Sequence, residues 1–299
     1  MQCALVSGSN GLIGRHLIEK LTIDGVKVIR LARSGTANAT TAIWNQSNGT
    51  IAGPIDEVDT LFHLAGAGVA DKRWNESYKR EILTSRVEGT HQVVLALSKE
   101  SNAKRFVIGS AIGFYGSDQS ELCDEDSPQG SGFLAKVVSE WENSALSATG
   151  VHGNIVLART GIVLASDGGV LKKQLPLFKT GLGGRIGDGS SYLSWIHIDD
   201  EVNALIHLAR SNTFGAVNLV APNPVTNGDF TKSLSQALKK PAFLTVPRIA
   251  LETLLGREMA LETALSSTNV SAQKLLSTGY KFKYPTLDVA LSQIVGAKG

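Results

Sequence analysis

The stretch SGSNGLIG, residues 7–14, places three glycines between a short apolar run (residues 2–7) and a helical pattern that continues to residue 25. Glycine is needed where a turn takes a positive φ, where backbone approaches a pyrophosphate, and where a helix packs closely on a strand. The free N–H groups at the start of such a helix attract phosphate. This position in a strand-turn-helix unit is typical of dinucleotide binding, the alternative being a glycine-rich turn without a ligand. We predict cofactor contacts from Gly8, Ser9, Asn10, Gly11, Leu12, Ile13 and Gly14.

Buried-strand patterns recur at residues 26–32, 59–66, 104–111 and 153–165, with helical patterns at 74–99 and from 130 onward. Strands that alternate with helices predict an α/β fold with a Rossmann-type, doubly wound parallel sheet. From about residue 222 the chain becomes turn-rich and then shows helical patterns at 228–239, 248–265 and 270–277. We therefore predict a nucleotide-binding domain at 1–221 and a small C-terminal lobe at 222–299, packed on the carboxyl edge of the sheet.

Composition excludes several classes of protein. The 299 residues are 42% hydrophobic with a net charge of +2, so disorder is excluded, and no polybasic run indicates nucleic acid or a membrane as partner. No apolar run reaches the roughly 18 residues of a membrane span. Cys3 and Cys123 form no CxxC pair, and the histidines show no metal-ligand spacing. We expect a cytoplasmic protein, a monomer or homodimer, that holds no metal and binds a small-molecule substrate.

The end of the second strand selects the cofactor. Residues 28–35, VIRLARSG, hold Arg30 and Arg33 and no carboxylate, whereas NAD binding calls for an acidic residue there. A guanidinium matches a 2′-phosphate, so the sequence predicts NADP(H), with Arg33 nearer the carboxyl end of the strand. The alternative is that both arginines are simply solvated.

Motifs further along the chain resemble one family. SGSNGLIG, HLAG (63–66), GSAIGFYG (109–116) and GDGSSYLSWIHIDD (187–200), in this order, resemble an extended short-chain dehydrogenase/reductase, and RWNESYKREILTSRVEGT (73–90) with GYKFKYP (279–285) resembles its atypical epimerase-family branch. The resemblance implies an NADP(H)-binding Rossmann fold with a substrate lobe. It also implies cofactor contacts from Leu64, Ala65, Gly66, Glu81 and Arg86.

The same resemblance implies a catalytic Ser, Tyr and Lys set, in which lysine lowers the pKa of the tyrosine so that it works as acid and base. Ser110 fits the serine position, or is a strand-end hydroxyl bonded to backbone. Lys136 fits the lysine position, but Gly132 stands four residues before it where the tyrosine belongs. Lys136 either binds the cofactor ribose or makes a weak helical pair with Glu140.

Three further residues have two interpretations each. Tyr115 is the nearest substitute for the missing acid/base, or an aromatic plug at the mouth of the pocket. Arg159 lines the nicotinamide end or binds a substrate anion, or else is a paired structural arginine. His197, in SWIHIDD, is more readily a hydrogen-bonded packing residue than a substrate contact.

Two functions follow from this sequence. The first is an NADP(H)-dependent oxidoreductase or epimerase-like enzyme on a small polar or sugar-derived substrate, with atypical acid/base chemistry. The second is an NADPH-binding sensor or scaffold without catalysis, which the missing tyrosine favours.

Overall fold

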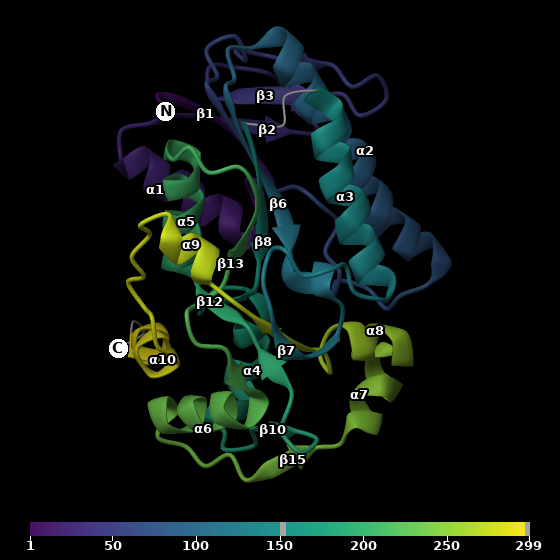
Figure 1. Cartoon of the computed structure of the whole chain (residues 1–299), viewed down its shortest axis with the longest axis vertical. Helices are drawn as coiled ribbons and strands as arrows, with labels where there is room; N and C mark the ends of the chain where they lie inside the picture. Colours follow the sequence, from purple (N-terminus) through teal and green to yellow (C-terminus); the bar gives the residue numbers. More distant parts are fainter. Residues whose placement is uncertain (150–153, 297–299) are drawn as a thin grey trace.

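An eight-stranded sheet forms the centre of the computed structural model, which describes residues 1–149 and 154–296 (Figure 1). The strand order is β13-β8-β6-β5-β1-β2-β3-β4, and every neighbouring pair is parallel except β3 and β4. The chain runs outward from β1 in one direction and then continues from β5 in the other, so the sheet is doubly wound, as predicted. The strands are β1 (Cys3–Ser7), β2 (Lys27–Ala32), β3 (Thr41–Trp44), β4 (Ile51–Ala52), β5 (Thr60–His63), β6 (Arg105–Ala111), β8 (Ile155–Thr160) and β13 (Gly215–Leu219).

Helices cover both faces of this sheet, which is why its central strands are apolar throughout. All five residues of β1 are buried. Ala4 and Val6 pack with α1 (Leu12–Ile23) and α5 (Ile198–Arg210) on one face, whereas Cys3 and Leu5 belong to the core of the opposite face. That face is covered by α2 (Glu76–Glu100) and α3 (Phe133–Thr149) (Figure 1). The α/β class predicted from the sequence is confirmed.

The predicted strand at 153–165 is wrong in its extent. Residue 153 lies outside the described residues, and the rest forms two strands, β8 in the main sheet and β9 (Ile162–Leu164), which pairs with β12 (Trp195–His197). The break falls at Gly161, where a Cβ atom would stand 2.5 Å from the carbonyl oxygen of Ser194. The close approach of the 194–197 segment therefore turns the chain out of the main sheet.

The C-terminal lobe has its own core. α4 (Gly169–Lys179), α6 (Asn227–Leu238) and α10 (Leu287–Gly296) contribute Leu171, Leu175, Phe178, Phe230, Leu234 and Leu291 to it. A two-stranded parallel sheet of β10 (Gly184–Ile186) and β15 (Leu244–Val246) lies beside these helices. Because α4 and β10 precede residue 222, the lobe gathers chain from both sides of the predicted boundary, and that boundary stays a prediction.

Two of the predicted lobe helices are shorter than expected. The pattern at 248–265 forms α7 (Arg248–Leu255) and α8 (Arg257–Glu262), interrupted at Gly256, whose φ of 88° ends α7. The pattern at 270–277 yields only α9 (Gln273–Ser277). The remaining elements are η1, a 3₁₀ turn (Ile112–Tyr115), β7 (Asp118–Cys123), β11 (Tyr192–Leu193), β14 (Val225–Thr226) and β16 (Ser267–Val270).

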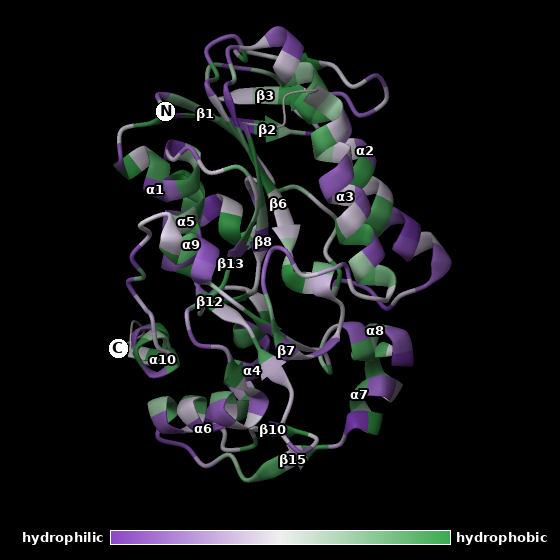
Figure 2. Ribbon diagram, in the orientation of Figure 1, coloured by the Kyte–Doolittle hydropathy of each residue, from purple (hydrophilic) through white to green (hydrophobic). Residues whose placement is uncertain are grey.

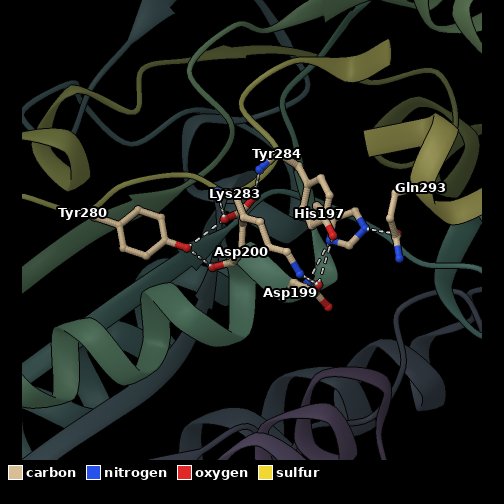
Figure 3. A network of polar contacts seen from close by, with 7 residues as sticks. All are labelled: His197, Asp199, Asp200, Tyr280, Lys283, Tyr284 and Gln293. Atoms are coloured by element: carbon tan, nitrogen blue, oxygen red, sulfur yellow. Dashed lines mark hydrogen bonds and ion pairs between the residues drawn. The ribbon is translucent and has the colours of Figure 1, made fainter. Parts of the chain in front are cut away.

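A buried carboxylate ties the last part of the lobe to the sheet domain (Figure 3). Asp200, in the first turn of α5, accepts hydrogen bonds from the Tyr280 hydroxyl (3.0 Å) and from the backbone N–H groups of Lys283 (2.7 Å) and Tyr284 (2.8 Å). His197 stacks on the Tyr284 ring at 3.9 Å between centroids, and its Nε2 lies 2.9 Å from Oε1 of Gln293. The SWIHIDD and GYKFKYP motifs therefore bind each other, and His197 is a packing residue.

Candidate cofactor cleft and active site

The glycine turn brings strand, helix and neighbouring loop into close contact. Gly8 takes a φ of +65°, and a Cβ atom there would stand 2.7 Å from the carbonyl oxygen of Leu64. A Cβ atom on Gly14 would stand 2.2 Å from the carbonyl oxygen of Gly8. Gly11 begins α1 without a side-chain cap, so the first N–H groups of the helix face outward. The turn therefore has the form that a phosphate group requires.

A cleft of about 900 Å³ opens above this turn at the carboxyl edge of the sheet. Leu12, Ile13 and Gly14 lie behind the turn rather than on the cleft wall, and Leu12 packs towards Gly168. The predicted residues on the wall are Gly8, Ser9, Asn10, Gly11, Arg33, Leu64, Ala65, Gly66 and Glu81.

Arg33 and Arg30 differ in position. Arg33 follows β2, is exposed, lines the cleft, and forms no ion pair within residues 1–149 and 154–296. Arg30 is also exposed but lies within β2 and away from the cleft wall. A cation without an ion-pair partner beside a phosphate-binding turn is available for an anionic ligand. Of these two arginines, Arg33 meets that description and Arg30 does not.

Arg86 lies beneath the loop that follows β5. Its Nη1 donates to the carbonyl oxygens of Ala67 (2.8 Å) and Ile82 (3.1 Å), and its guanidinium carbon lies 5.2 Å from the centre of the Trp141 ring. A Cβ atom on Gly66 would stand 3.1 Å from that carbon. Burial lowers the pKa of Arg86 to about 10, which leaves it charged at neutral pH. Arg86 thus holds the loop from beneath and does not itself line the cleft.

Glu81 is exposed on the outer part of the same wall. Its Oε2 lies 3.7 Å from Nζ of Lys72, which also lines the cleft. Glu81 thus forms a long, exposed surface pair with Lys72.

Ser7 is a cleft residue that the sequence patterns did not reveal. Ser7 Oγ accepts hydrogen bonds from the N–H groups of Leu64 (3.0 Å) and Ala65 (3.2 Å), so its own proton points to Nδ1 of His63, 2.9 Å away. His63 then carries its proton on Nε2, which is buried without a partner in the described part of the chain. Burial lowers the pKa of His63 to about 4, so the ring is neutral. This bridge holds the ends of β1 and β5 together under the cleft.

Trp44 and Gln92 are also cleft residues that the sequence patterns did not reveal. The indole N–H of Trp44 and the side-chain carbonyl oxygen of Gln92 are buried and have no hydrogen-bond partner among the described residues. Both residues line the cleft near Arg33. Buried polar groups are normally hydrogen-bonded, so these two atoms are exceptions among the residues that line the cleft.

Ser110, Tyr115 and Arg159 do come together, but in a buried network. The Ser110 hydroxyl donates to Oε1 of Glu142 at 2.6 Å, and Arg159 donates to both oxygens of Glu142 at 2.8 Å. Nη1 of Arg159 lies 3.0 Å from the Tyr115 hydroxyl, which donates to Oδ1 of Asn218 at 2.7 Å. All five side chains are buried, and none lines the cleft.

This network limits what the two hydroxyls can do. Burial raises the pKa of Tyr115 to about 12, although Arg159 and Asn218 act in the opposite direction. A phenol with such a pKa stays protonated near neutral pH, so almost no phenolate is present to act as a base. The single proton of Ser110 is already donated to Glu142, so it is not free for a substrate oxygen. The geometry favours a packed aromatic at Tyr115 and a paired structural arginine at Arg159.

The start of α3 shows why the usual tyrosine is missing. Gly132 has a φ of +107°, and a Cβ atom there would stand 2.9 Å from Oε1 of Glu262, in α8 of the lobe. The two Glu262 oxygens accept hydrogen bonds from the N–H groups of Phe133 (2.8 Å) and Leu134 (2.7 Å). A carboxylate from the lobe therefore caps α3 at the tyrosine position.

Lys136 lies one turn further along α3. Its side chain is 69% exposed, and Nζ lies 3.7 Å from Oε1 of Glu140. The weak helical pair considered from the sequence is therefore present, and such a long exposed contact leaves the lysine free to move to a ligand.

Glu201 is a buried carboxyl group beside the end of β8. Thr160 donates to its Oε1 at 2.8 Å, Oε2 has no partner among the residues described, and burial raises its pKa from 4.5 to about 8. Between these pH values the Glu201 carboxyl group is protonated in the folded state and ionised in the unfolded state. Its contribution to the free energy of unfolding therefore falls as pH rises from 4.5 to 8.

Glu201→Gln keeps an acceptor for Thr160 and cannot ionise. We compare the free energy of unfolding of this variant with that of the unchanged chain at two pH values. The difference in favour of the variant should be larger at pH 8 than at pH 5 by roughly 2–4 kcal/mol. Urea unfolding at the two pH values measures this difference, and Glu100→Gln, at an exposed position, is the control. A Glu201→Gln effect that does not change with pH would contradict the prediction.

The described residues contain neither a cluster of metal ligands nor a membrane-spanning helix. No group of three or more His, Cys, Asp or Glu side chains within residues 1–149 and 154–296 is arranged to hold a metal ion. In the same part of the chain, every helix is too short or too polar to span a membrane.

Solved structures share this architecture. The human epimerase family protein SDR39U1, crystallised with NADPH, matches with a TM-score of 0.90 and 31% identity over 98% of this chain and 99% of that chain. A nucleoside-diphosphate sugar epimerase from Corynebacterium glutamicum matches with a TM-score of 0.76 and 32% identity over 99% of this chain and 58% of that chain. UDP-glucose 4-epimerase from Thermotoga maritima, at 18% identity and a TM-score of 0.74 over 98% of this chain and 97% of that chain, shows the same fold.

Sequence comparisons agree with the resemblance predicted above. The epimerase family protein ML0860 of Mycobacterium leprae is 37% identical over 96% of this chain and 94% of its own length. The model of a domain of unknown function (DUF1731) matches residues 246–294. The model of the NAD dependent epimerase/dehydratase family matches residues 4–219, and the chain belongs to that family.

Proposed function

We propose that this chain binds NADP(H) in the cleft and acts as an oxidoreductase or epimerase-like enzyme on a small polar or sugar-derived substrate. The observation that carries the proposal is Arg33, an exposed cation on the cleft wall without an ion-pair partner in the described part of the chain. A guanidinium forms charge-assisted, often bidentate hydrogen bonds with a phosphate. The presence of NADPH in the crystal structure of the human relative supports the same cofactor here.

The cleft residues fit the parts of such a dinucleotide. The N–H groups at the start of α1 and the close backbone of Gly8 and Gly14 suit the pyrophosphate. An adenine ring offers ring-nitrogen acceptors and an amino donor, which complement the unpaired Trp44 N–H and Gln92 oxygen. We propose that Leu64, Ala65 and Gly66 give the backbone access to the ligand while Arg86 supplies a second positive charge.

The chemistry beyond cofactor binding involves α3 and the buried network. The nicotinamide ring supplies hydride transfer when it is bound. We propose that Lys136 leaves Glu140 to donate to the ribose hydroxyl groups. Ser110 and Tyr115 hold the end of β6 in place through Glu142, Arg159 and Asn218, and a direct part in proton transfer requires this network to open.

Arg33→Ala should weaken NADPH binding by roughly 10- to 100-fold, because charge-assisted hydrogen bonds contribute about 1.5–3 kcal/mol. NADH lacks the 2′-phosphate, so its affinity should change little. Titration of both nucleotides by their fluorescence measures the two affinities, and Arg30→Ala is the matched control on the same strand. Equal affinity of the unchanged chain for NADPH and NADH, or equal losses in the two variants, would overturn the choice of cofactor.

The second candidate function is an NADPH-binding sensor or scaffold without catalysis. The buried state of the Ser110 and Tyr115 hydroxyls favours it, since neither reaches the cleft. Hydride exchange with panels of carbonyl compounds and nucleotide sugars, followed by NADPH absorbance, separates the two functions. Turnover that Lys136→Ala reduces supports the enzyme, whereas NADPH binding without turnover on any panel supports the sensor.

Compartment and partners belong to the same proposal. Cys3 and Cys123 are free and buried, which supports a reducing compartment such as the cytoplasm. The partner we propose is a small molecule rather than a nucleic acid, and a monomer or homodimer stays the prediction for the oligomeric state.

A further inference from the structure

The outer end of the C-terminal lobe is built from two segments, residues 177–187 and 239–255, which we call the lobe tip. The parallel pairing of β10 with β15 joins them, with Gly184 opposite Leu244 and Arg185 opposite Thr245. A Cβ atom on Gly181 would also lie 3.5 Å from the Pro241 side chain. Figure 1 shows β10, β15 and α7 together at the end of the molecule away from β1–β3.

The lobe tip exposes an unusual amount of apolar surface. It contains six of the twelve large hydrophobic side chains that are exposed within the described residues, although it holds only 28 of the 299 residues. Phe243 is 92% exposed, and Ile249 and Leu254 on α7 are 72% and 71% exposed. α7 buries no residue, and Figure 2 shows hydrophobic positions on α7 and β15 at the surface. Surface of this kind marks an interaction site.

The same two segments are strongly basic. They carry five Lys and Arg residues and a single carboxylate, Glu252, for a formal charge of +4, while the whole chain carries +2 and the remainder therefore −2. All five are exposed, and none forms a salt bridge within residues 1–149 and 154–296. These residues are Lys179, Arg185, Lys239, Lys240 and Arg248.

We propose that the lobe tip is a peripheral docking surface for an anionic lipid bilayer. Lipid headgroups pair with the unpartnered cations, while Phe243, Ile249 and Leu254 enter the boundary between headgroups and acyl chains. A second copy of this chain, docked symmetrically through the same surface, would bring +4 against +4, which charge repulsion opposes. Nucleic acid matches the charge but not the exposed aliphatic side chains.

The sequence did not predict this surface, because its charges are not consecutive. Lys179 and Lys239 are 60 positions apart, and only the β10–β15 pairing brings their segments together. The expectation that no membrane is a partner rested on the absence of a polybasic run. No helix among the described residues is long and apolar enough to span a membrane, and the binding proposed here is peripheral.

Cosedimentation with vesicles tests the proposal. The full chain should bind vesicles of phosphatidylcholine with 30% phosphatidylglycerol, and not vesicles of phosphatidylcholine alone. Lys239→Glu with Lys240→Glu should reduce binding at least about tenfold, because each cation near the surface contributes to the attraction. Phe243→Ser with Ile249→Ser should do the same by removing the inserted groups.

Matched controls use the same chemistry elsewhere on the surface. Lys99→Glu with Lys104→Glu, and Ile23→Ser with Phe214→Ser, change exposed residues outside the lobe tip and should leave binding within about twofold. Circular dichroism melts show that each variant folds. Absence of binding to the anionic vesicles would overturn the proposal. If Phe243→Ser with Ile249→Ser leaves vesicle binding unchanged, the insertion of apolar side chains is overturned. If the chain self-associates through the lobe tip, or binds acidic protein instead of vesicles, lipid is overturned as the partner.

Discussion

Arg159→Ala should lower the free energy of unfolding by about 3–5 kcal/mol, because it leaves the buried Glu142 carboxylate without its cation. In the intact protein both oxygens of Glu142 accept from Arg159 at 2.8 Å, and the side chains are 5% and 8% exposed. Tyr115 would lose its Arg159 contact at the same time. Urea unfolding followed by circular dichroism measures the change.

A surface arginine supplies the control for this result. Arg210→Ala removes an ion pair with Asp24 in which the nitrogen and oxygen lie 3.7 Å apart and the arginine is about half exposed. This variant should lower the free energy of unfolding by less than about 1 kcal/mol. The double variant Glu142→Met with Arg159→Met should cost less than Arg159→Ala alone, since no unpaired charge remains. A loss for Arg159→Ala as small as that for Arg210→Ala would show that the network contributes little to stability.

Gly14→Ala should reduce NADPH affinity at least about 100-fold, the scale of a lost phosphate-binding turn. The added Cβ atom would stand 2.2 Å from the Gly8 carbonyl oxygen, so either the turn or α1 has to shift. Nucleotide fluorescence titration measures the loss, and the melting temperature should fall as well.

The matched control is Gly296→Ala, at the end of α10. A Cβ atom there meets no atom within 4 Å, so this change should leave NADPH affinity unaltered and should not destabilise the protein. If Gly14→Ala bound NADPH as tightly as Gly296→Ala, the glycine turn would not be the phosphate site.

The parts of the fold that depend on local sequence were predictable. The glycine turn and the fully apolar strands follow from patterns within about ten residues, and they lead to the doubly wound sheet. Gly161 and Gly256 gave no equally clear local signal, because their effect depends on Ser194 and on a positive φ. A strand and a helix were therefore predicted as longer than they are.

The site residues that the sequence missed all depend on tertiary contacts. Glu142 lies in the middle of α3, where a carboxylate usually indicates a solvated face, and only Arg159 on β8 shows that it is buried. Trp44 and Gln92 stand out only in the folded structure, where an indole N–H and a side-chain oxygen are buried without a hydrogen-bond partner among the described residues. Arg33, by contrast, was identified from its place after the second strand and lies on the cleft wall.

The cap on α3 links the sequence of the lobe to that of the sheet domain. Glu262 holds the N–H groups of Phe133 and Leu134 from 128 and 129 positions away, and its oxygens occupy the space beside Gly132. A tyrosine at position 132 would need a different backbone conformation, and the Glu262 carboxylate would have to move away from the start of α3. Two distant parts of the chain therefore set the start of α3, so a design that restores the tyrosine also has to provide for the contact from the lobe.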